Sequence, residues 1–532
     1  MNHLTDQNWL LTAGIFTPLL GAVVMMFIPR AEEQLHKIVA LAAALLTLVF
    51  GIVTMAKFKY DQADSLQFYV DKTWIPVIKS RYILGMDGLG LPLYVLSMAI
   101  VALVIIYSWN HIPAPGNPKA FLALMLLLEV GMNGTFVAQD LILFFVFFEI
   151  VLLPMYFMIG VWGGENRQYA SLKFFLFTLF GSAFMLLGFL GLFFKTGATT
   201  FGIQELAGLV QSMGISKSTQ TLIFAGMFLG FAIKVPMFPF HTWLPDAHTQ
   251  APTQGSVLLA AILLKLGTFG FIRIGIPILP LGAKAWAPVI AILAVIGIIY
   301  GALGCLAQTD MKRLIAFSSV AHMGFVMLGI STLTSFGLNA AMFGMVAHGL
   351  ITGMLFFVAG SVKERYHTLE IKRLSGMLKQ MPHLGWIMGF CAMASLGLPG
   401  LAGFWGEFPA ILSSYNPAPG LSVTLFRTCM VIAAIGTVLA AGYLLWLYQR
   451  TAFGEPSAEF AGGGDDHGHG TDGHDAADDH ASDIHDVNLT EWIAWAPLLA
   501  AIVVFGVYPQ FMFKLFDPAV SFALKGVAAI GG

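Results

Sequence analysis

Charged side chains interrupt several long apolar runs of this sequence. Lys234 lies in LIFAGMFLGFAIKVPMFPFHTWLPDAHTQAPT, and Lys265 lies in GSVLLAAILLKLGTFGFIRIG. Glu129, Glu149 and Glu407 lie in runs of the same kind. Because one charge near the centre of a bilayer costs roughly 2.5 to 3.5 kcal/mol on insertion scales, charges that are kept there indicate a functional site. We expect the five side chains to face one another, water or polar backbone.

These residue types suit proton transfer. Removal from water disfavours the charged forms of lysine and glutamate, so buried groups of both kinds exchange protons more readily. A lysine whose carboxylate partner moves toward it and away from it acts as a proton switch. His322, in SSVAHMGF, and His348, in GMVAHGLITG, lie near mid-helix and can pass protons through either ring nitrogen. The set predicts a proton path inside the membrane.

A purely structural interpretation is open at single positions. A lone intramembrane histidine can be a packing residue that is hydrogen-bonded, and Glu129 can bond a neighbouring helix. Glu149 and Lys234 can form a structural ion pair. Five mid-span charges together with two interrupted helices are better explained by a transport path.

The composition places the chain in a membrane. Of its 532 residues, 58% are hydrophobic and 11% are charged, and the mean hydropathy is +0.80. The runs are too long and too uniformly apolar for barrel strands, so an all-α integral membrane protein is predicted. Units of roughly 20 residues give about fourteen transmembrane helices. They are predicted near 9–28, 36–56, 84–107, 119–138, 140–161, 169–194, 219–246, 253–274, 285–307, 313–332, 337–361, 383–413, 425–448 and 490–511.

Two of these helices are predicted to be discontinuous. Pro236 and Pro239 interrupt the seventh, and Pro399, Gly400 and Gly403 interrupt the twelfth. Proline removes a backbone donor and glycine loosens the backbone, so each span should contain a non-helical stretch. Such stretches are tolerated where they are buried in protein or line a hydrated cavity.

The interruptions fall at equivalent places in two five-helix units, which is typical of internally repeated transporters. The predicted organisation is an N-terminal three-helix region (1–118), a first repeat with helices 4–8 (119–274), a second repeat with helices 9–13 (285–448), a disordered His/Asp-rich loop (449–489) and the last helix with its tail (490–532).

The loop offers possible metal ligands, and the rest of the chain offers few cofactor signals. The irregular spacing of the loop histidines favours a solvated linker over a metal site. They are His467, His469, His474, His480 and His485. Cys305, Cys391 and Cys429 stand alone in apolar segments and are expected to be core residues, and no nucleotide, phosphate or zinc motif is present.

Orientation follows from basic residues. Apart from the 57–83 connection, lysine and arginine favour the odd-to-even connections, which the positive-inside rule places in the cytoplasm. Both termini are then expected on the outer side. The N-terminus lacks the basic stretch of a cleavable signal peptide, so the first span is expected to be retained.

Four runs resemble the antiporter-like membrane subunits of respiratory complex I. They are FFEIVLLPMYFMIGVWG, KVPMFPFHTWLPDAHTQAPTQGSVLLAAILLKLGTFGFIR, QTDMKRLIAFSSVAHMGF and LPGLAGFWGEF. The resemblance covers nearly the whole chain, and the chain M type, equivalent to mitochondrial subunit 4, is the best match. It implies fourteen helices with two inverted five-helix repeats, each forming half of a proton path.

The resemblance also implies roles for single residues. These are a switch pair in the first half for Glu149 and Lys234, a central relay for Lys265, the terminal group of the second half for Glu407, and positions on the axis between them for His322 and His348.

Two groups of relatives share these runs, namely Mrp-type cation/proton antiporters and membrane subunits of energy-converting hydrogenases. The larger chain L of complex I shares them too, but it usually has lysine where Glu407 stands and carries a long C-terminal lateral helix. Both differences favour chain M. The His/Asp-rich loop departs from the family's usual pattern, which leaves its role open.

The implied function is proton translocation by a subunit of NADH:quinone oxidoreductase in a bacterial cytoplasmic membrane. The resemblance implies no redox centre in this chain, with NADH, FMN, Fe-S clusters and quinone bound by other subunits. Neighbouring antiporter-like subunits and lipid are the expected partners, and nucleic acid is not. A scaffold subunit, in which the charges only hold helices together, is an alternative of another class, and a cation/proton exchanger is a third.

Overall fold

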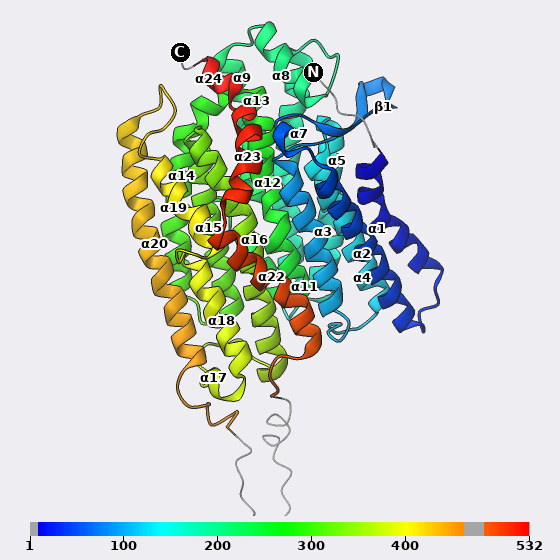
Figure 1. Ribbon diagram of the computed structural model, residues 1–532, viewed down its shortest axis with the longest axis vertical. Coiled ribbons are helices and arrows are strands. Elements are labelled where there is room, and N and C mark those ends of the chain that lie inside the picture. Colours follow the sequence, from blue (N-terminus) through cyan, green and yellow to red (C-terminus); the bar gives the residue numbers. More distant parts are fainter. Residues whose placement is uncertain (1–8, 462–483, 531–532) are drawn as a thin grey trace, which may run out of the picture.

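The computed structural model describes residues 9–461 and 484–530. Its helices form an elongated bundle in which most axes run close to parallel (Figure 1). The short helix α24 (Lys525–Ala529) lies at one end of the bundle and α17 (Met377–Gln380) lies at the other (Figure 1).

Within the described residues, twelve helical segments are long and apolar enough to cross a membrane. Ten are single helices: α1 (Trp9–Phe27), α2 (Glu33–Lys57), α3 (Gly90–Tyr107), α4 (Pro118–Val137), α7 (Arg167–Lys195), α14 (Pro280–Leu306), α15 (Met311–Ser331), α16 (Ser335–Tyr366), α20 (Val423–Ala452) and α22 (Leu489–Val507). Two are composite: α5 (Leu141–Ile150) with α6 (Leu152–Trp162), and the stretch from α11 (Thr253–Leu258) to α13 (Ile276–Ile278).

The two remaining predicted spans are those predicted to be discontinuous, and both interruptions are present. α9 (Lys217–Lys234) is separated from α10 (Trp243–Gln250), and α18 (Pro382–Ser395) is separated from α19 (Ala402–Ser413). The total of fourteen spans and the inverted relation between the two five-helix units stay predictions.

Backbone groups freed by the first interruption are bonded within the protein. Pro236 follows α9 and has no N–H to donate. The carbonyl of Ile233 accepts a hydrogen bond from Nε1 of Trp243 at 2.9 Å, and the carbonyl of Ala232 accepts one from the amide of Met237 at 2.9 Å. The interruption is therefore compatible with a membrane because protein groups replace the missing helical donors.

Glycines form the second interruption. Gly397 and Gly400 adopt positive φ angles of 81° and 94°, which glycine tolerates without steric cost. A Cβ at Gly403 would lie 2.0 Å from the carbonyl oxygen of Ala394. Glycine at this position allows α19 to begin directly against the end of α18.

The stretch from α11 to α13 contains two π-helical turns. Leu259–Leu263 and Phe271–Gly275 flank α12 (Leu264–Gly270). A π turn closes its hydrogen bonds one residue later than an α turn and often occurs at functional sites. Almost every residue of the stretch is buried, so α12 lies in the interior of the bundle.

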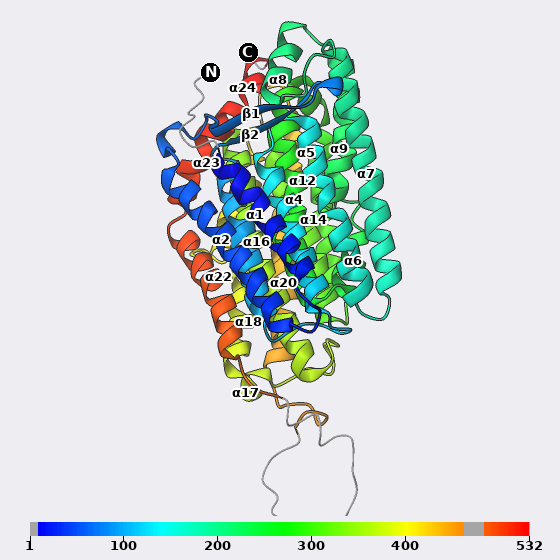
Figure 2. The same cartoon turned by 90° about the vertical axis from the view of Figure 1, so that its right-hand side faces the viewer.

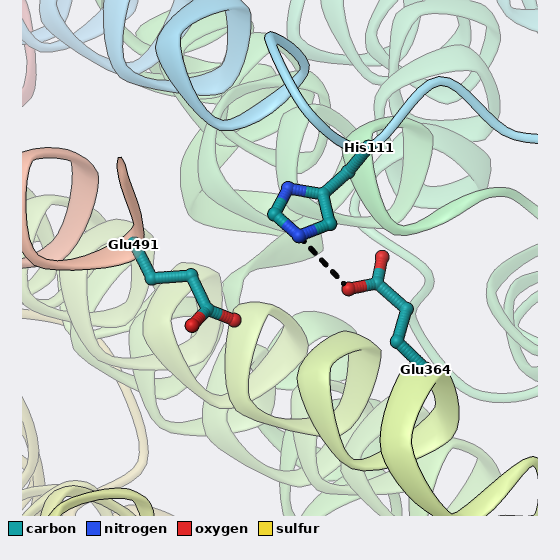
Figure 3. A group of neighbouring side chains, drawn as sticks. All are labelled: His111, Glu364 and Glu491. Atoms are coloured by element: carbon teal, nitrogen blue, oxygen red, sulfur yellow. Dashed lines mark ion pairs between the residues drawn. The ribbon is translucent and has the colours of Figure 1, made fainter. Parts of the chain in front are cut away.

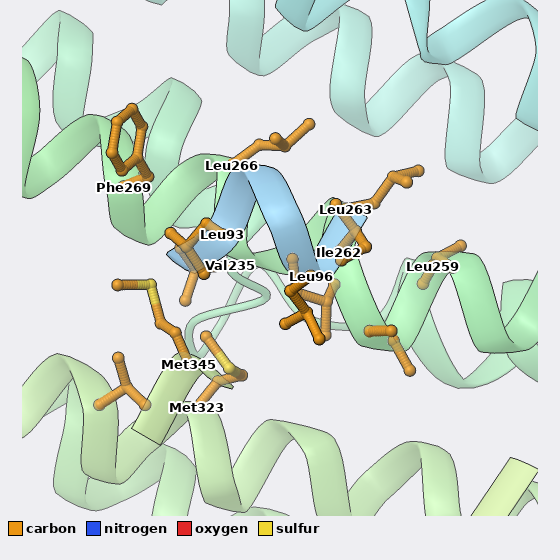
Figure 4. Close-up of a cluster of buried hydrophobic side chains, with 14 of the residues drawn as sticks. Leu93, Leu96, Val235, Leu259, Ile262, Leu263, Leu266, Phe269, Met323 and Met345 are labelled. Carbon is orange, nitrogen blue, oxygen red and sulfur yellow. The ribbon is translucent and has the colours of Figure 1, made fainter. Parts of the chain in front are cut away.

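Apolar side chains hold this stretch in place. Figure 4 shows Leu263 and Leu266 in one buried cluster with Leu96 of α3, Met323 of α15 and Met345 of α16. The position of α12 is therefore fixed by helices from both predicted repeats and from the N-terminal region.

The chain is helical as predicted, and one short hairpin that the sequence analysis did not predict lies between α2 and α3. β1 (Gln67–Ile75) and β2 (Ser80–Met86) form an antiparallel hairpin, which crosses one end of the bundle (Figure 2). Aromatic and β-branched residues in QFYVDKTWI suit a strand, but Asp71 and Lys72 among them resemble a solvated connection. The helix predicted to begin at residue 84 begins at Gly90.

The hairpin is bonded to two transmembrane elements. Oγ of Ser80 and the amide of Arg81 donate to the carboxylate of Asp140 at 3.0 and 3.1 Å, and Asp140 caps α5. Immediately after β2, Asp87 forms a buried bidentate ion pair with Arg273 in the second π turn. The hairpin therefore fixes the beginning of α5 and the end of the stretch that contains α12.

Smaller elements complete the described fold. They are the 3₁₀ turns Tyr60–Gln62 and Pro76–Ile78, and the helices α8 (Ile203–Ser212) and α23 (Gln510–Ala523).

Residues near both ends of the predicted His/Asp-rich loop are bound to helices or their connections. Glu459 pairs with Arg373, and Asp486 pairs with His383 at 2.7 Å. His485 is among the described residues. The other loop histidines, His467, His469, His474 and His480, lie outside the described residues.

Candidate functional site

Lys265 and His348 form the first part of a buried polar series. Lys265 lies on α12 and is fully buried, and its Nζ is 2.7 Å from Nδ1 of His348 on α16. The same ammonium donates to the carbonyl of Ala260, inside the first π turn. The charge of Lys265 is thus solvated by one imidazole and one backbone carbonyl in the middle of the protein.

His322 and Glu407 form the second part. Nδ1 of His322 on α15 is 2.5 Å from Oε1 of Glu407 on α19. The other ring nitrogen, Nε2, lies 3.1 Å from Oγ of Ser395 and 3.2 Å from the hydroxyl of Tyr443. Both ring nitrogens of His322 therefore have polar partners.

A small cavity joins the two parts. It has a volume of about 20 Å³ and is lined by His348, His322, Glu407 and Ser395, among others. The two imidazole centroids are 6.1 Å apart. A polar cavity of this size accommodates about one water molecule, which can bridge the two histidines. Lys265, His348, His322 and Glu407 then form one hydrogen-bonded series.

Glu149 and Lys234 lie near each other without forming an ion pair. Within the described residues, no contact of 4.0 Å or less joins their charged groups. Nζ of Lys234 lies 4.8 Å from the ring centroid of Phe148. Besides Lys234, the polar neighbour of Glu149 is Ser182. The ammonium therefore faces an aromatic ring and remains close enough to the carboxylate to feel its charge.

The first interruption positions Lys234. It is the last residue of α9, where the negative end of the helix dipole favours a cation. A Cβ at Gly267 would lie 2.7 Å from the carbonyl oxygen of Phe231 and 3.1 Å from Cβ of Lys234. Glycine at this position allows α12, which carries Lys265, to pack directly against the end of α9.

Glu129 occupies a separate position. It is fully buried on α4. Its polar neighbours are Asn133 and Tyr94, and neither of its carboxylate oxygens has a hydrogen-bond partner among the described residues. Neither residue belongs to the series between Lys265 and Glu407. The structure brings four of the seven predicted residues together as two hydrogen-bonded pairs that meet at one cavity, places two more near each other without a bond, and leaves Glu129 apart.

Sequence reasoning missed Ser395, Tyr443 and His248. His248 lies on α10 and is fully buried, stacked on Phe356 with the centroids 4.4 Å apart. Neither of its ring nitrogens has a hydrogen-bond partner among the described residues. For His248, the sequence did offer a signal, namely its position soon after the first interruption. Ser395 and Tyr443 gave none, because serine and tyrosine are common in apolar helices.

A second polar cluster joins three elements where α16 ends and α22 begins (Figure 3). Nε2 of His111 is 3.1 Å from Oε2 of Glu364, and Glu491 is close to both. Arg365 binds both carboxylate oxygens of Glu491 at 2.7 and 3.0 Å, and Asn488 completes a capping box with it. Because both carboxylate oxygens of Glu491 already accept hydrogen bonds from these donors, we interpret the cluster as structural: it holds the beginning of α22 against the end of α16.

We expect Glu491→Gln to destabilise the protein. The side chains of Arg365 and Glu491 are 2% and 0% exposed, and breaking a buried pair costs about 3–5 kcal/mol. The temperature at which the detergent-solubilised protein loses its fold should fall clearly. Glu459→Gln is the matched control, because its pair with Arg373 is 44% exposed on both sides and should contribute about 0–1 kcal/mol. Equal unfolding temperatures for the two variants would contradict this structural role.

Two family models match the chain. The model described as NADH:quinone oxidoreductase/Mrp antiporter matches residues 138–433, and NADH-ubiquinone oxidoreductase chain 4, amino terminus, matches 13–135. NADH-quinone oxidoreductase subunit M of Rhodobacter capsulatus is 38% identical over 536 residues, which is 98% of each chain. NADH-ubiquinone oxidoreductase chain 4 of Arabidopsis thaliana is 35% identical over 524 residues, also 98% of each.

Solved structures agree with the fold. A chain of respiratory complex I from Thermus thermophilus superposes with a TM-score of 0.81 at 28% identity, with 98% of this chain and 100% of that chain covered. A chain of the Mrp complex from a Dietzia species superposes with a TM-score of 0.83 at 20% identity, with 99% of both chains covered. At that identity the second likeness concerns the fold alone.

Proposed function

We propose that this chain, which belongs to the family of NADH-quinone oxidoreductase subunit M and NADH-ubiquinone oxidoreductase chain 4, moves protons along its buried ionisable side chains. The chain is a multi-pass membrane subunit of that oxidoreductase, respiratory complex I. Its antiporter-like fold is shared with related membrane complexes.

The observation that carries the proposal is the series from Lys265 to Glu407. Lys265 donates its proton to Nδ1 of His348, 2.7 Å away. His348 passes a proton from Nε2 to water in the cavity, and the bonded pair of His322 and Glu407 accepts it. The first transfer joins groups in direct hydrogen-bond reach, and the second needs a bridging water. His348 is then left with its proton on Nδ1 and must return that proton to Nε2 before it accepts the next one from Lys265.

In the first half, Lys234 and Glu149 act as the switch that loads Lys265. The ammonium moves between the Phe148 ring, where it now lies at 4.8 Å, and the carboxylate of Glu149. When the carboxylate is distant, the ammonium is poorly solvated and releases its proton more readily. The close packing of Gly267 on the end of α9 places the recipient helix beside it.

Redox chemistry is assigned to other subunits, which bind NADH, FMN, Fe-S clusters and quinone. The three cysteines, Cys305, Cys391 and Cys429, lie on different helices, whereas Fe-S clusters generally take four cysteine ligands. Neighbouring antiporter-like subunits are the expected partners. The distribution of basic residues supports cytoplasmic odd-to-even connections and both termini on the outer side.

The test measures proton movement in vesicles that contain the purified complex. NADH and quinone should drive acidification of the lumen, and a protonophore should abolish it. A sodium gradient without electron input should drive none. Sodium-driven proton movement would favour the cation/proton exchanger. Neutral substitutions that lower the amount of assembled complex, but not the pumping per assembled complex, would favour the scaffold.

Glu407 separates relay from scaffold. Glu407→Gln keeps the shape and removes the ionisable group bonded to His322, so pumping should fall about 100-fold. Glu407→Asp moves the carboxylate by one methylene and should retain much more pumping. Subunit content, measured on native gels, should be equal for both variants. Normal pumping by Glu407→Gln would place Glu407 in the packing.

A further inference from the structure

An apolar cavity of about 210 Å³ lies between α2, α3, α16, α22 and α23, apart from the proton series. Its lining side chains are apolar except for Tyr60, whose hydroxyl donates to the carbonyl of Met55 at 3.0 Å. The lining thus offers water no free polar side-chain group, and cavities of this kind do not hold water. Figure 2 shows α2, α22 and α23 along one side of the bundle, where they face the surroundings.

The cavity is long and narrow. On α3 its lining residues run from Leu91 to Leu103, which is about 18 Å of helix at 1.5 Å per residue. A helix of that length is about 10–12 Å across and needs several times the volume available. An occupant must therefore be a thin apolar chain.

One end of the cavity lies beside exposed positive charges. Tyr60 and Leu515 line that end, and the exposed Lys59 and Lys514 are their neighbours in the sequence. Lys57 is also exposed nearby, and Asp61, Asp64 and Asp517 lie in the same two segments. The two lysines that adjoin the lining residues can bind the phosphate that every phospholipid carries, and tyrosine suits the boundary between headgroups and hydrocarbon.

We propose that this cavity binds one acyl chain of a phospholipid, with its phosphate beside Lys59 and Lys514. The cavity is bordered by membrane-crossing helices, so lipid chains reach it directly. An unfilled cavity of this size is unfavourable because its lining loses dispersion contacts. An acyl chain in the cavity restores these contacts and packs against α3, α22 and α23 together.

The proposal is tested on the purified complex in vesicles of phosphatidylglycerol that carries a photoactivatable diazirine along one acyl chain. After illumination, label should appear in peptides that contain residues 91–103 and 497–505. Ala99 and Ala501 line the cavity. Ala99→Phe and Ala501→Phe each displace about two methylenes of the chain, so labelling should fall about tenfold. Ala183→Phe, on an exposed position of α7, is the matched control and should leave this labelling unchanged.

Lys59→Gln with Lys514→Gln tests the contact to the phosphate. The double variant should lower the labelling of the same peptides, both by phosphatidylglycerol and by phosphatidylcholine with the same chains and diazirine. The lipid assignment is overturned if the cavity peptides are unlabelled, or if both phenylalanine variants label like the control. It is also overturned if a photoactivatable quinone outcompetes the phospholipid, or if these peptides crosslink to a helix of a neighbouring subunit.

Discussion

Lys265→Met should stop NADH-driven proton pumping while the complex still assembles. Methionine keeps much of the length and volume of the lysine but removes the ammonium that bonds both His348 and the carbonyl of Ala260. Loss of a proton-transfer group typically lowers a rate 10²–10⁴-fold, so pumping should fall by about 100-fold or more. The rate of lumen acidification in proteoliposomes measures the effect.

Assembly must be measured beside it. The substitution leaves Nδ1 of His348 without its present partner, at a cost of about 1–3 kcal/mol, which is small for a protein of this size. Lys119→Met is the control, because its Nζ donates to the carbonyls of Met26 and Ile28 outside the series. If Lys265→Met pumps like Lys119→Met, the central relay is wrong.

Lys234→Arg should also abolish pumping, although it conserves the charge. A guanidinium stays protonated at any reachable pH, so the switch could no longer release a proton. Glu149→Gln should act similarly by removing the partner that recharges the ammonium, with a loss of about 100-fold for each variant. Electron transfer and acidification should be recorded on the same vesicles.

The position of the Lys234 ammonium over Phe148 provides a further test. Lys234 lies over Phe148 and not on Glu149, so Phe148→Leu should remove its alternative position and slow pumping less than Lys234→Arg does. An arginine variant that pumps normally would show that position 234 contributes charge alone. The first half of the path would then need another switch.

Much of the fold followed from the sequence because membrane insertion constrains it so strongly. Apolar length predicted the twelve continuous spans, and proline and glycine predicted both interruptions. The β1–β2 hairpin was missed because its lysines and aspartate resemble a solvated connection. Its position on the bundle also involves Asp140 and Arg273, which lie far away in the sequence.

The sequence was sufficient to select candidate residues for the site, but not to predict which of them bond one another. Residue types identified Lys265, His322, His348 and Glu407 because ionisable groups in apolar helices are rare. The direct bond of His322 to Glu407 and the cavity beside it depend on how α15, α16 and α19 pack. Such packing leaves no trace in the spacing of residues along the chain. The partners Ser395 and Tyr443 were missed for the same reason.

The π turn at Leu259–Leu263 has a consequence for how this chain can change over generations. A π turn is equivalent to one residue inserted into a regular helix. A deletion of one residue within it would leave hydropathy almost unchanged and restore an ordinary helix. Because the π turn absorbs the extra residue, the side chains beyond it would keep nearly their present positions. A regular helix, however, bonds every interior carbonyl to a backbone amide, so the ammonium of Lys265 would lose the carbonyl of Ala260 that it now uses.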